Sequence, residues 1–164
     1  MTGDIEFAIL APVPLVHLQS GVVVCASQGF VAFGSNKWEQ FRTIDEIRKD
    51  RPVPCLLYAS HEGVPGKLAF AVTWFGWYIG HVDSVGGAHP EKMKYRPEST
   101  FRYAGDSAGH WAVYWHVTGL RELPKEKHSP IGNLQSHARG TWRKNAPPRG
   151  PELVELSQLF ADEA

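Results

Sequence analysis

The sequence is poor in cysteine, has no long apolar run and carries no excess charge of either sign. Among its 164 residues there are two cysteines, and 17 Lys and Arg residues balance 17 Asp and Glu residues. A net charge of zero gives the chain no global attraction for an anionic partner. No apolar run approaches the roughly 18 residues of a transmembrane helix, and the N-terminus lacks the features of a signal peptide. We therefore expect a cytoplasmic protein with no membrane partner.

The two cysteines, Cys25 and Cys55, both lie within apolar segments of the chain. Disulfides are rare in the cytosol, and apolar surroundings suit a reduced thiol in a core. The length of the chain is typical of one domain with a core of its own. We therefore predict a single domain over residues 1–164 with both thiols reduced.

Motifs for metal binding and nucleotide binding are also missing. Eight histidines are present, yet no C-x-x-C or H-E-x-x-H spacing occurs, and there is no Walker A loop or G-x-G-x-x-G. The glycine-rich stretch 84–90 lacks the strand-to-helix context of a phosphate-binding loop. We therefore expect no metal, no cofactor and no catalytic residues.

Most of the chain is predicted to form strands. Short β-branched and aromatic segments bounded by Pro, Ser and Gly are typical of strands, and four of them are residues 5–10, 22–26, 30–33 and 54–60. Residues 110–120 alternate in character, which places the two tryptophans on one face and the tyrosine on the other. We expect this last strand to be central, with one face wholly buried.

Helices are expected to be few and short. Thr43 and Glu46 have the spacing of a capping box, and Pro151 suits the first position of an amphipathic helix over 151–162. Residues 131–138 are expected to form one or two helical turns, and 84–109 a long polar excursion of functional importance. The pattern favours a mostly β (α+β) fold, a barrel or strongly curved sheet with peripheral helices.

The segment TWFGWYIGHV, residues 73–82, concentrates aromatic residues on both faces of a single strand or of two strands joined at Gly76. Strict alternation places Trp74 and Tyr78 on one face and Trp77 and His81 on the other. Neither face is polar enough to lie open to water. Either the fold buries both faces, or one of them lines a ligand pocket.

Positive charge is concentrated locally, in the excursion and near the C-terminus. Basic residues interleaved with Trp and Tyr suit nucleic acid, because cations hold phosphates while flat rings stack on bases. The alternative is a solvated loop without function. The residues that we assign to phosphate contacts are Lys94, Arg96, Arg139, Arg143, Lys144 and Arg149, the last four forming a basic segment over 139–149.

The order of several short motifs resembles that of the EVE domains of the PUA-like superfamily, and more distantly that of YTH and ASCH domains. A capped helix precedes Y-x-S, a P-G turn leads to G-x-V, and W-x-V and S-P-I-x-x-L follow the excursion. These motifs begin at Tyr58, Gly80, Trp111 and Ser129. The W-x-G-V-R-N element typical of EVE domains is absent, and Asn36 and Trp38 lie near its place.

The resemblance implies a PUA-like pseudo-barrel with helices at its edges, and a pocket bordered by aromatic residues that binds a modified nucleobase. We expect the partner to be DNA carrying 5-methylcytosine, read by base flipping, with RNA left open, and a nuclease or regulatory protein as a further partner. The residues that we assign to the base pocket are Asn36, Trp38, Tyr58, Ser60, Trp77, Tyr78 and Asp83.

Two other functions remain open at this point. A small enzyme would use a histidine–carboxylate pair, such as His81 and Asp83, in the same cavity. A barrel that binds a small molecule would have no nucleic-acid partner. Binding of DNA without turnover separates the first hypothesis from these two.

Overall fold

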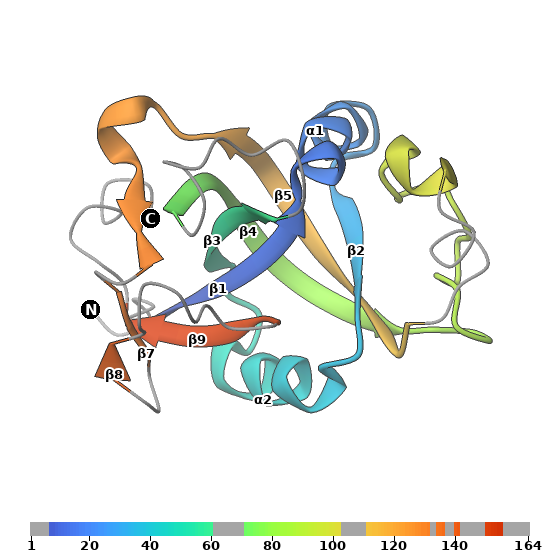
Figure 1. The fold of residues 1–164 in the computed structure, drawn as a ribbon. Coiled ribbons are helices and arrows are strands. Elements are labelled where there is room, and N and C mark those ends of the chain that lie inside the picture. Colours follow the sequence, from blue (N-terminus) through green and yellow to red (C-terminus); the bar gives the residue numbers. More distant parts are fainter. Residues whose placement is uncertain are drawn as a thin grey trace.

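The computed structural model describes residues 7–60, 71–102, 111–131, 134–136, 140–141 and 150–155. These residues form a mixed nine-stranded sheet with two α-helices and two short 3-10 helices (Figure 1). In chain order the elements are β1 (Phe7–Pro14), α1 (Leu15–Gln28), β2 (Val31–Ser35), α2 (Trp38–Arg48), β3 (Val53–Ser60), β4 (Ala71–Asp83), η2 (Glu98–Arg102), β5 (Val113–Glu122), η3 (Lys125–Lys127), β6 (Ser129–Pro130), β7 (Gln135–Ser136), β8 (Gly140–Thr141) and β9 (Glu152–Glu155).

The sheet is open rather than closed. Its strand order is β2-β5-β4-β3-β1-β9-β7-β8, with β6 paired to β4. Strands β1 and β3 run parallel, whereas the other pairs are antiparallel. No pairing joins the outer strands β2 and β8 within the described residues. The expectation of a mostly β, α+β fold is therefore confirmed, while a closed barrel is wrong for the described strands.

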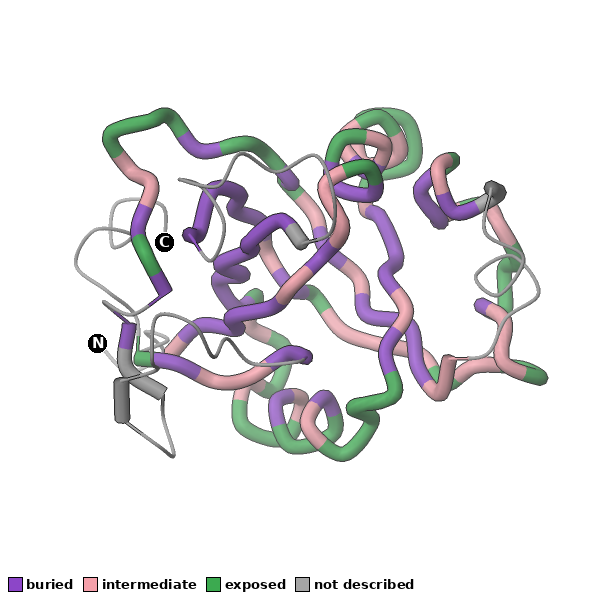
Figure 2. Tube along the Cα trace, in the orientation of Figure 1, coloured by how far each residue is buried: buried purple, intermediate pink, exposed green. Residues whose placement is uncertain are grey.

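Each face of the sheet carries its own core (Figure 2). The helix-side core includes Leu18 of α1 and Phe41 and Ile44 of α2, which pack over the face that bears Trp115. The opposite core is closed by a segment that follows β5, and its members Leu123, Ile131 and Leu134 are all at most 3 % exposed. The sheet is thus covered on both sides, as the aromatic pattern of its strands requires.

Strand β5 has the predicted position and burial. It pairs with β2 on one side and β4 on the other. Val113, Trp115 and Val117 on its helix-side face are at most 2 % exposed. The predicted buried face is therefore confirmed from Val113 to Val117, whereas Trp111, which was predicted on the same face, is half-buried. Strand β3 likewise matches the predicted strand 54–60.

The predicted strand 22–26 is wrong, because these residues lie in α1. The run of valines here has strand propensity, but tertiary packing overrides it. The helix is bounded by Pro14 at its start and by Gly29, at φ 94°, at its end. Gly29 donates its N–H to the carbonyl of Cys25 and so closes the last turn. Proline before and glycine after a helix are the sequence signals that identify it.

The capping box at Thr43 and Glu46 is also wrong, because α2 begins earlier, at Trp38. Thr43 is exposed in the middle of the helix. The N–H of Lys37, at the N-cap position, donates to the hydroxyl of Ser35 at 3.0 Å. A polar side chain just before the helix thus orders the turn between β2 and α2.

The C-terminal helix predicted over 151–162 is wrong where the structure describes it. Glu152–Glu155 form β9, which pairs antiparallel with β1. The alternation of this segment buries Val154 while Glu155 stays exposed, and the edge of β1 supplies partners for its backbone N–H and C=O groups. Residues 156–162 lie outside the described residues. Of the predicted turns over 131–138, one is present, because the N–H of Leu134 donates to the carbonyl of Ile131 at 2.9 Å, and the short strand β7 follows it.

Both cysteines are free thiols, Cys55 buried and Cys25 half-buried, as predicted. Burial raises the pKa of the Cys55 thiol far above its usual range, so it remains protonated.

Among the described residues, no helix has the length and apolar character needed to cross a membrane.

Candidate functional site

A bulge in β4 sets the direction of His81. Tyr78 pairs with Val117 and Gly80 with His116, so Ile79 is an extra residue on the β4 side. Gly80 has a φ of 137°, a backbone conformation that glycine adopts readily and other residues rarely adopt. Because of the bulge, His81 faces the same side of the sheet as Tyr78, whereas strict alternation predicts opposite sides.

The bulge brings His81 and Tyr78 to one carboxylate of α2. The Nδ1 atom of His81 lies 2.6 Å from Oδ2 of Asp45, and the hydroxyl of Tyr78 donates to Oδ1 at 2.9 Å. Arg48 donates its Nε–H to the same Oδ1 at 2.6 Å. Asp45 therefore accepts three hydrogen bonds and fixes the orientation of an imidazole, a phenol and a guanidinium.

These contacts determine the chemistry of the two rings. An ionised carboxylate only accepts, so His81 donates its Nδ1–H to Asp45. Within the described residues, Nε2 has no hydrogen-bond partner. Burial, together with the charge of Asp45, raises the pKa of Tyr78, which stays a neutral donor.

The predicted pair of His81 and Asp83 is not formed. Asp83 is exposed at the end of β4, and the carboxylate that holds His81 is Asp45. Asp45 was missed because 36 residues separate it from His81 and because the bulge cannot be seen in the hydrophobic pattern. The glycine between the histidine and the aromatic run is the signal for it.

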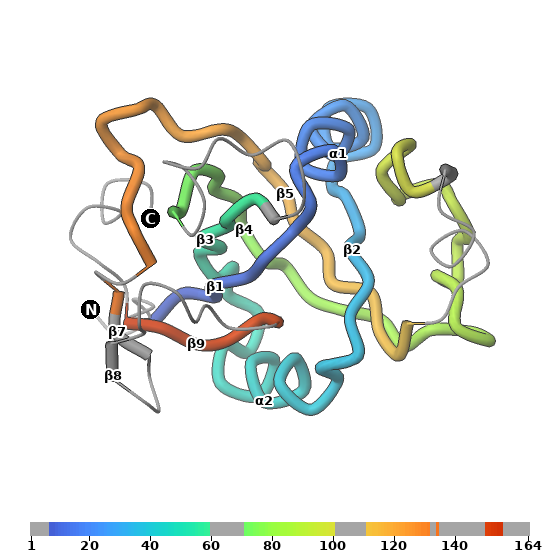
Figure 3. The backbone as a smooth tube through the Cα atoms, viewed as in Figure 1, coloured from blue at the N-terminus to red at the C-terminus, as the bar shows by residue number. Residues whose placement is uncertain are grey.

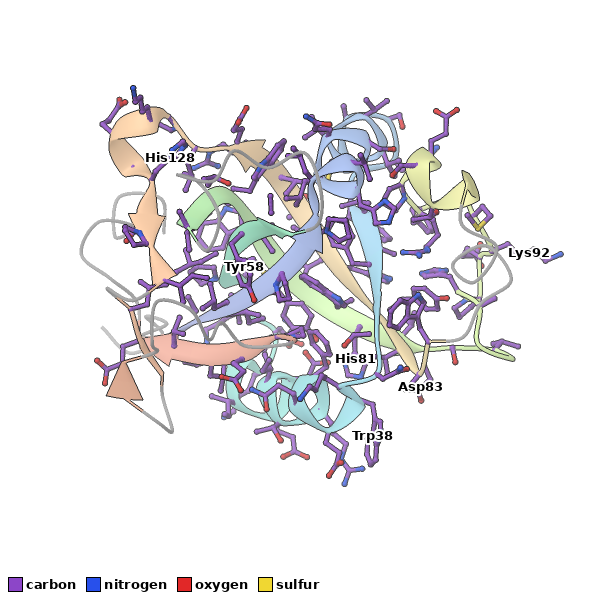
Figure 4. All side chains as sticks on the ribbon, viewed as in Figure 1. Trp38, Tyr58, His81, Asp83, Lys92 and His128 are labelled. Carbon is purple, nitrogen blue, oxygen red and sulfur yellow. The ribbon has the colours of Figure 1, made fainter. Side chains whose placement is uncertain are left out.

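Three of the predicted pocket residues lie near the ends of β2 and β4 and the start of β5. The N–H of Ala112, just before β5, donates to Oδ1 of Asn36 at 2.9 Å, and Asp83 pairs with Val113. Asn36 and Asp83 therefore flank the start of β5 from either side. Trp38, two residues beyond Asn36, is 44 % exposed. In Figure 4, Trp38, His81 and Asp83 are seen in the same region, at the α2 side of the sheet.

We call Asn36, Trp38, Asp83 and Trp111 the strand-end site. Asn36 accepts through its oxygen, so its NH2 group points elsewhere and has no partner among the described residues. A Cβ atom at Gly34 would lie 2.2 Å from the ring of Trp111, so that ring packs closely against the glycine backbone. The site thus offers an amide donor at Asn36 and a carboxylate acceptor at Asp83.

The other predicted pocket residues lie elsewhere. Tyr58 is 3 % exposed in the opposite core, where burial, and to a lesser extent the charge of Glu152, raises its pKa. Trp77 packs beside the same core with an edge-on contact to Phe75. Tyr78 is fully buried in the helix-side core. These rings are structural, and the side chain of Ser60 lies outside the described residues.

The predicted phosphate contacts divide into three groups. Lys94 is exposed, with its ammonium 5.1 Å from the centre of the Tyr95 ring. Arg96 is only 4 % exposed and donates to the carbonyl of Ala32 at 2.8 Å, a placement that argues against a phosphate contact. The predicted residues Arg139, Arg143, Lys144 and Arg149 lie outside the described residues.

The excursion after β4 covers the outer edge of β2 (Figure 3). The N–H of Ala32 donates to the carbonyl of Tyr95 at 2.7 Å, and the Tyr95 ring stacks on Phe30 at 4.3 Å between centres. Arg96 lies over the Tyr114 ring at 4.9 Å. This edge would otherwise be free to pair with another chain. The described part of the excursion, residues 84–102, is therefore a structural cover.

A histidine pair fastens this cover to β5. The Nε2 atoms of His89 and His116 are 3.1 Å apart, and the N–H of Glu91 donates to Nδ1 of His89 at 2.9 Å. His89 must then carry its proton on Nε2 and donate it to His116. Burial, and next the charge of Arg96, lowers the pKa of His89, while burial and the charge of His89 lower that of His116 to about 4. Both rings are neutral at pH 7.

The described residues contain no group of three or more side chains placed to hold a metal ion. A G-x-S-x-G spacing does occur at residues 105–109, which lie outside the described residues. A nucleophile elbow follows a strand and opens a helix, whereas this stretch lies between the 3-10 helix η2 and strand β5. The order of elements around this stretch, a helix and then a strand, is therefore the reverse of the order that a nucleophile elbow requires.

Comparison with known protein families, curated proteins and solved structures gives no match for this chain. Its function must therefore be inferred from the strand-end site and from the His81–Asp45 pair.

Proposed function

We propose that the protein binds nucleic acid and recognises a modified base, 5-methylcytosine in DNA, that is flipped into the strand-end site. The observation that carries the proposal is the placement of Asn36 and Asp83 on either side of the start of β5, with the exposed ring of Trp38 two residues beyond Asn36. The proposal includes kinship with PUA-like domains, which the motif order and the mostly β architecture support.

The chemistry of the site suits a base. A flipped base needs a flat surface for stacking and polar groups for its edge. Trp38 offers an exposed indole ring, Asn36 offers an amide donor, and Asp83 offers an acceptor of the kind that contacts the amino group of cytosine. Burying one methyl group adds only about 0.8 kcal/mol, so the polar contacts must supply the rest of the selectivity.

Cations lie next to this surface. The guanidinium of Arg42 lies 5.6 Å from the centre of the Trp38 ring, and Lys37 is exposed one residue before that ring. Exposed cations beside an aromatic ring favour the backbone and bases of a nucleic acid. Together with Lys94 and the segment 139–149 they would supply most of the affinity, which is independent of sequence.

A comparison of two tryptophan variants tests the proposal. Trp38→Ala should weaken binding of a methylated duplex by about 1–3 kcal/mol, which is the range of base stacking on an aromatic ring. Its melting temperature should barely change, because the ring is largely exposed. Trp77→Ala is the matched control, and it should lower the melting temperature while leaving the ratio of methylated to plain binding unchanged. The reverse pattern would place the base pocket at Trp77.

A small hydrolytic enzyme is the second candidate, favoured by the 2.6 Å contact between His81 and Asp45. A carboxylate that holds Nδ1–H and leaves Nε2 free is the arrangement of a general base. Incubation of labelled methylated and plain oligonucleotides with the protein separates the two functions. Binding without any change in the oligonucleotide supports the reader, and conversion that is abolished in His81→Phe supports the enzyme.

A further inference from the structure

The histidine pair that fastens the excursion to β5 has no place for a further proton. His89 uses both ring nitrogens, because its Nδ1 accepts from the N–H of Glu91 at 2.9 Å and its Nε2 lies 3.1 Å from Nε2 of His116. A proton added to Nδ1 of His89 would face the N–H of Glu91. A proton added to Nε2 of His116 would face the Nε2–H of His89. Either protonation therefore replaces a hydrogen bond by two donors that point at each other.

The pair lies among aromatic rings from both sides of the contact. Phe30, just before β2, lies 4.4 Å from the ring of His116 and 4.3 Å from that of Tyr95 between centres. The rings of His89 and Tyr95 meet edge-on at 5.7 Å, and His89 is only 4 % exposed. Such surroundings exclude the water that would solvate a charged imidazole. A positive charge on either ring is therefore favoured only if the rings separate.

The charged groups around His89 come from the excursion itself. Burial, and next the charge of Arg96, lowers the pKa of His89, whereas the charge of Glu91 raises it. Arg96 is held in place, since it is buried and donates to a carbonyl of β2 at 2.8 Å. The ammonium of Lys94 adds positive charge 5.1 Å from the centre of the Tyr95 ring. A protonated His89 would therefore lie beside a fixed positive charge.

The groups around His116 come from the strands. Burial, and next the charges of His89 and of His81 on β4, lowers the pKa of His116 to about 4. The titratable side chain beside it on β5 is that of Tyr114, whose hydroxyl donates to the carbonyl of Gly87 at 2.7 Å. Strand β2, which pairs with β5 here, has no titratable side chain. The pair therefore stays neutral at pH 7 and takes up protons only at acidic pH.

The cover can leave the sheet without exposing either core. Neither core contains a residue of the segment 84–102. The far end of the cover is held separately, by η2 on α1, where Nδ1 of His17 lies 2.6 Å from Oγ of Ser99. Segments that add little to a core are those that open locally, well below the free energy of global unfolding. Residues 84–96 therefore form a part of the fold that can open alone.

We propose that the His89–His116 pair is a pH-sensitive switch, whose protonation releases residues 84–96 from the edge of β2. The bonds that join Ala32 to Tyr95 and Arg96 then break as well, and the outer backbone groups of β2 face water. In the open form both histidines regain an ordinary pKa near 6.5. The open-to-closed ratio should therefore rise as the pH falls below 6.5, by up to about tenfold per pH unit for each histidine, until the pKa of the closed form is reached.

Amide hydrogen exchange of the intact protein at pH 7 and pH 5 tests the switch. The N–H of Ala32 donates to the carbonyl of Tyr95 in the cover. Its protection factor, corrected for the effect of pH on the intrinsic exchange rate, should fall about tenfold or more between the two pH values. The amides of β3, which is paired on both sides, report global unfolding and should lose much less protection.

Two substitutions of the same kind locate the effect. In His116→Gln, whose carbonyl can still accept from His89, the pH dependence at Ala32 should be smaller than in wild type. His128→Gln is the matched control, because His128 bonds to the carbonyl of Leu123 outside the pair, and it should behave as wild type. This pattern supports the switch.

Three outcomes would overturn the switch, and none of them involves nucleic acid, so the proposed function stands or falls separately. Equal loss of protection at Ala32 and in β3 would mean that the cover leaves only by global unfolding. Unchanged protection at Ala32 would mean that acid does not release it. A wild-type pH dependence in His116→Gln, folded by its melting curve, would exclude the histidine pair as the cause.

Discussion

The imidazole of His81 is held by the carboxylate of Asp45, with 2.6 Å between Nδ1 and Oδ2, although 36 residues separate the two in the chain. This contact joins α2 to the last part of β4. Three donors converge on Asp45, whose side chain is 28 % exposed. Its carboxylate is therefore a structural link as well as the group that fixes the histidine tautomer.

The first prediction concerns the stability of this link. Asp45→Ala leaves the donors of Arg48, Tyr78 and His81 without their acceptor, and the free energy of unfolding should fall by about 1–3 kcal/mol. Urea denaturation measures the change. Asp83→Ala is the matched control, because this exposed carboxylate lies on the same strand as His81, and it should change the stability by less than about 0.5 kcal/mol. Equal losses of unfolding free energy in Asp45→Ala and Asp83→Ala would contradict a stabilising role for the hydrogen bonds to Asp45.

The second prediction concerns the bulge. Gly80→Ala should destabilise the fold by about 1–3 kcal/mol, because φ 137° is strained for any residue with a Cβ atom. It should also disturb the contact between His81 and Asp45, since the bulge aims His81. Gly86→Ala is the control, at φ 62° in open space, and it should cost about 1 kcal/mol without altering that contact. Thermal melting measures the stability, and the NMR signals of the His81 ring report the contact.

Alternation in the sequence predicted β5 well, because it places Val113, Trp115 and Val117 against one core at every second position. Strand β3 was predicted from its short apolar run after a proline. Prediction from such patterns failed for α1, where packing of Leu18 and Gly21 against the sheet outweighs the strand propensity of the valines. It also failed for His81, because one extra residue in β4 reverses the facing of everything that follows.

The candidate site could be predicted only in part, because the sequence does not show which of its aromatic residues are buried. Asn36, Trp38 and Asp83 were chosen by residue type and motif order, and the structure places Asn36 and Asp83 on either side of the start of β5. Tyr58 and Tyr78 were chosen as aromatic residues near those motifs, but aromatic residues also dominate small cores. Amino-acid composition does not distinguish a pocket ring from a core ring, whereas burial in the structure does.

The third prediction concerns pH. The pKa values of His89 and His116 lie below the usual value of 6.5, that of His116 at about 4. The unfolded chain therefore binds more protons between pH 6.5 and about 4, so the free energy of unfolding should decrease as the pH falls through this window. Melting curves across it should show a steeper loss in wild type than in His116→Gln, whose carbonyl can still accept from His89. Identical slopes would exclude the histidine pair as the cause.

The fourth prediction concerns the basic segment. If Arg139, Arg143, Lys144 and Arg149 contact phosphates, each change to Ala should weaken methylated and plain DNA alike and reduce the slope of log affinity against log salt by about one unit. Arg96→Lys is not expected to change this slope, because Arg96 is buried against β2. An unchanged slope of log affinity against log salt in the quadruple variant would show that the segment is a solvated loop without phosphate contacts.

The most direct test of the central claim is the ratio of wild-type affinities for duplexes that differ only in one 5-methyl group, measured by fluorescence anisotropy at two salt concentrations. We expect the methylated duplex to bind more tightly at both concentrations, because phosphate contacts weaken equally on the two duplexes while the base contacts do not. A ratio of one for 5-methylcytosine and for its oxidised forms, at either salt concentration, would contradict recognition of a modified base.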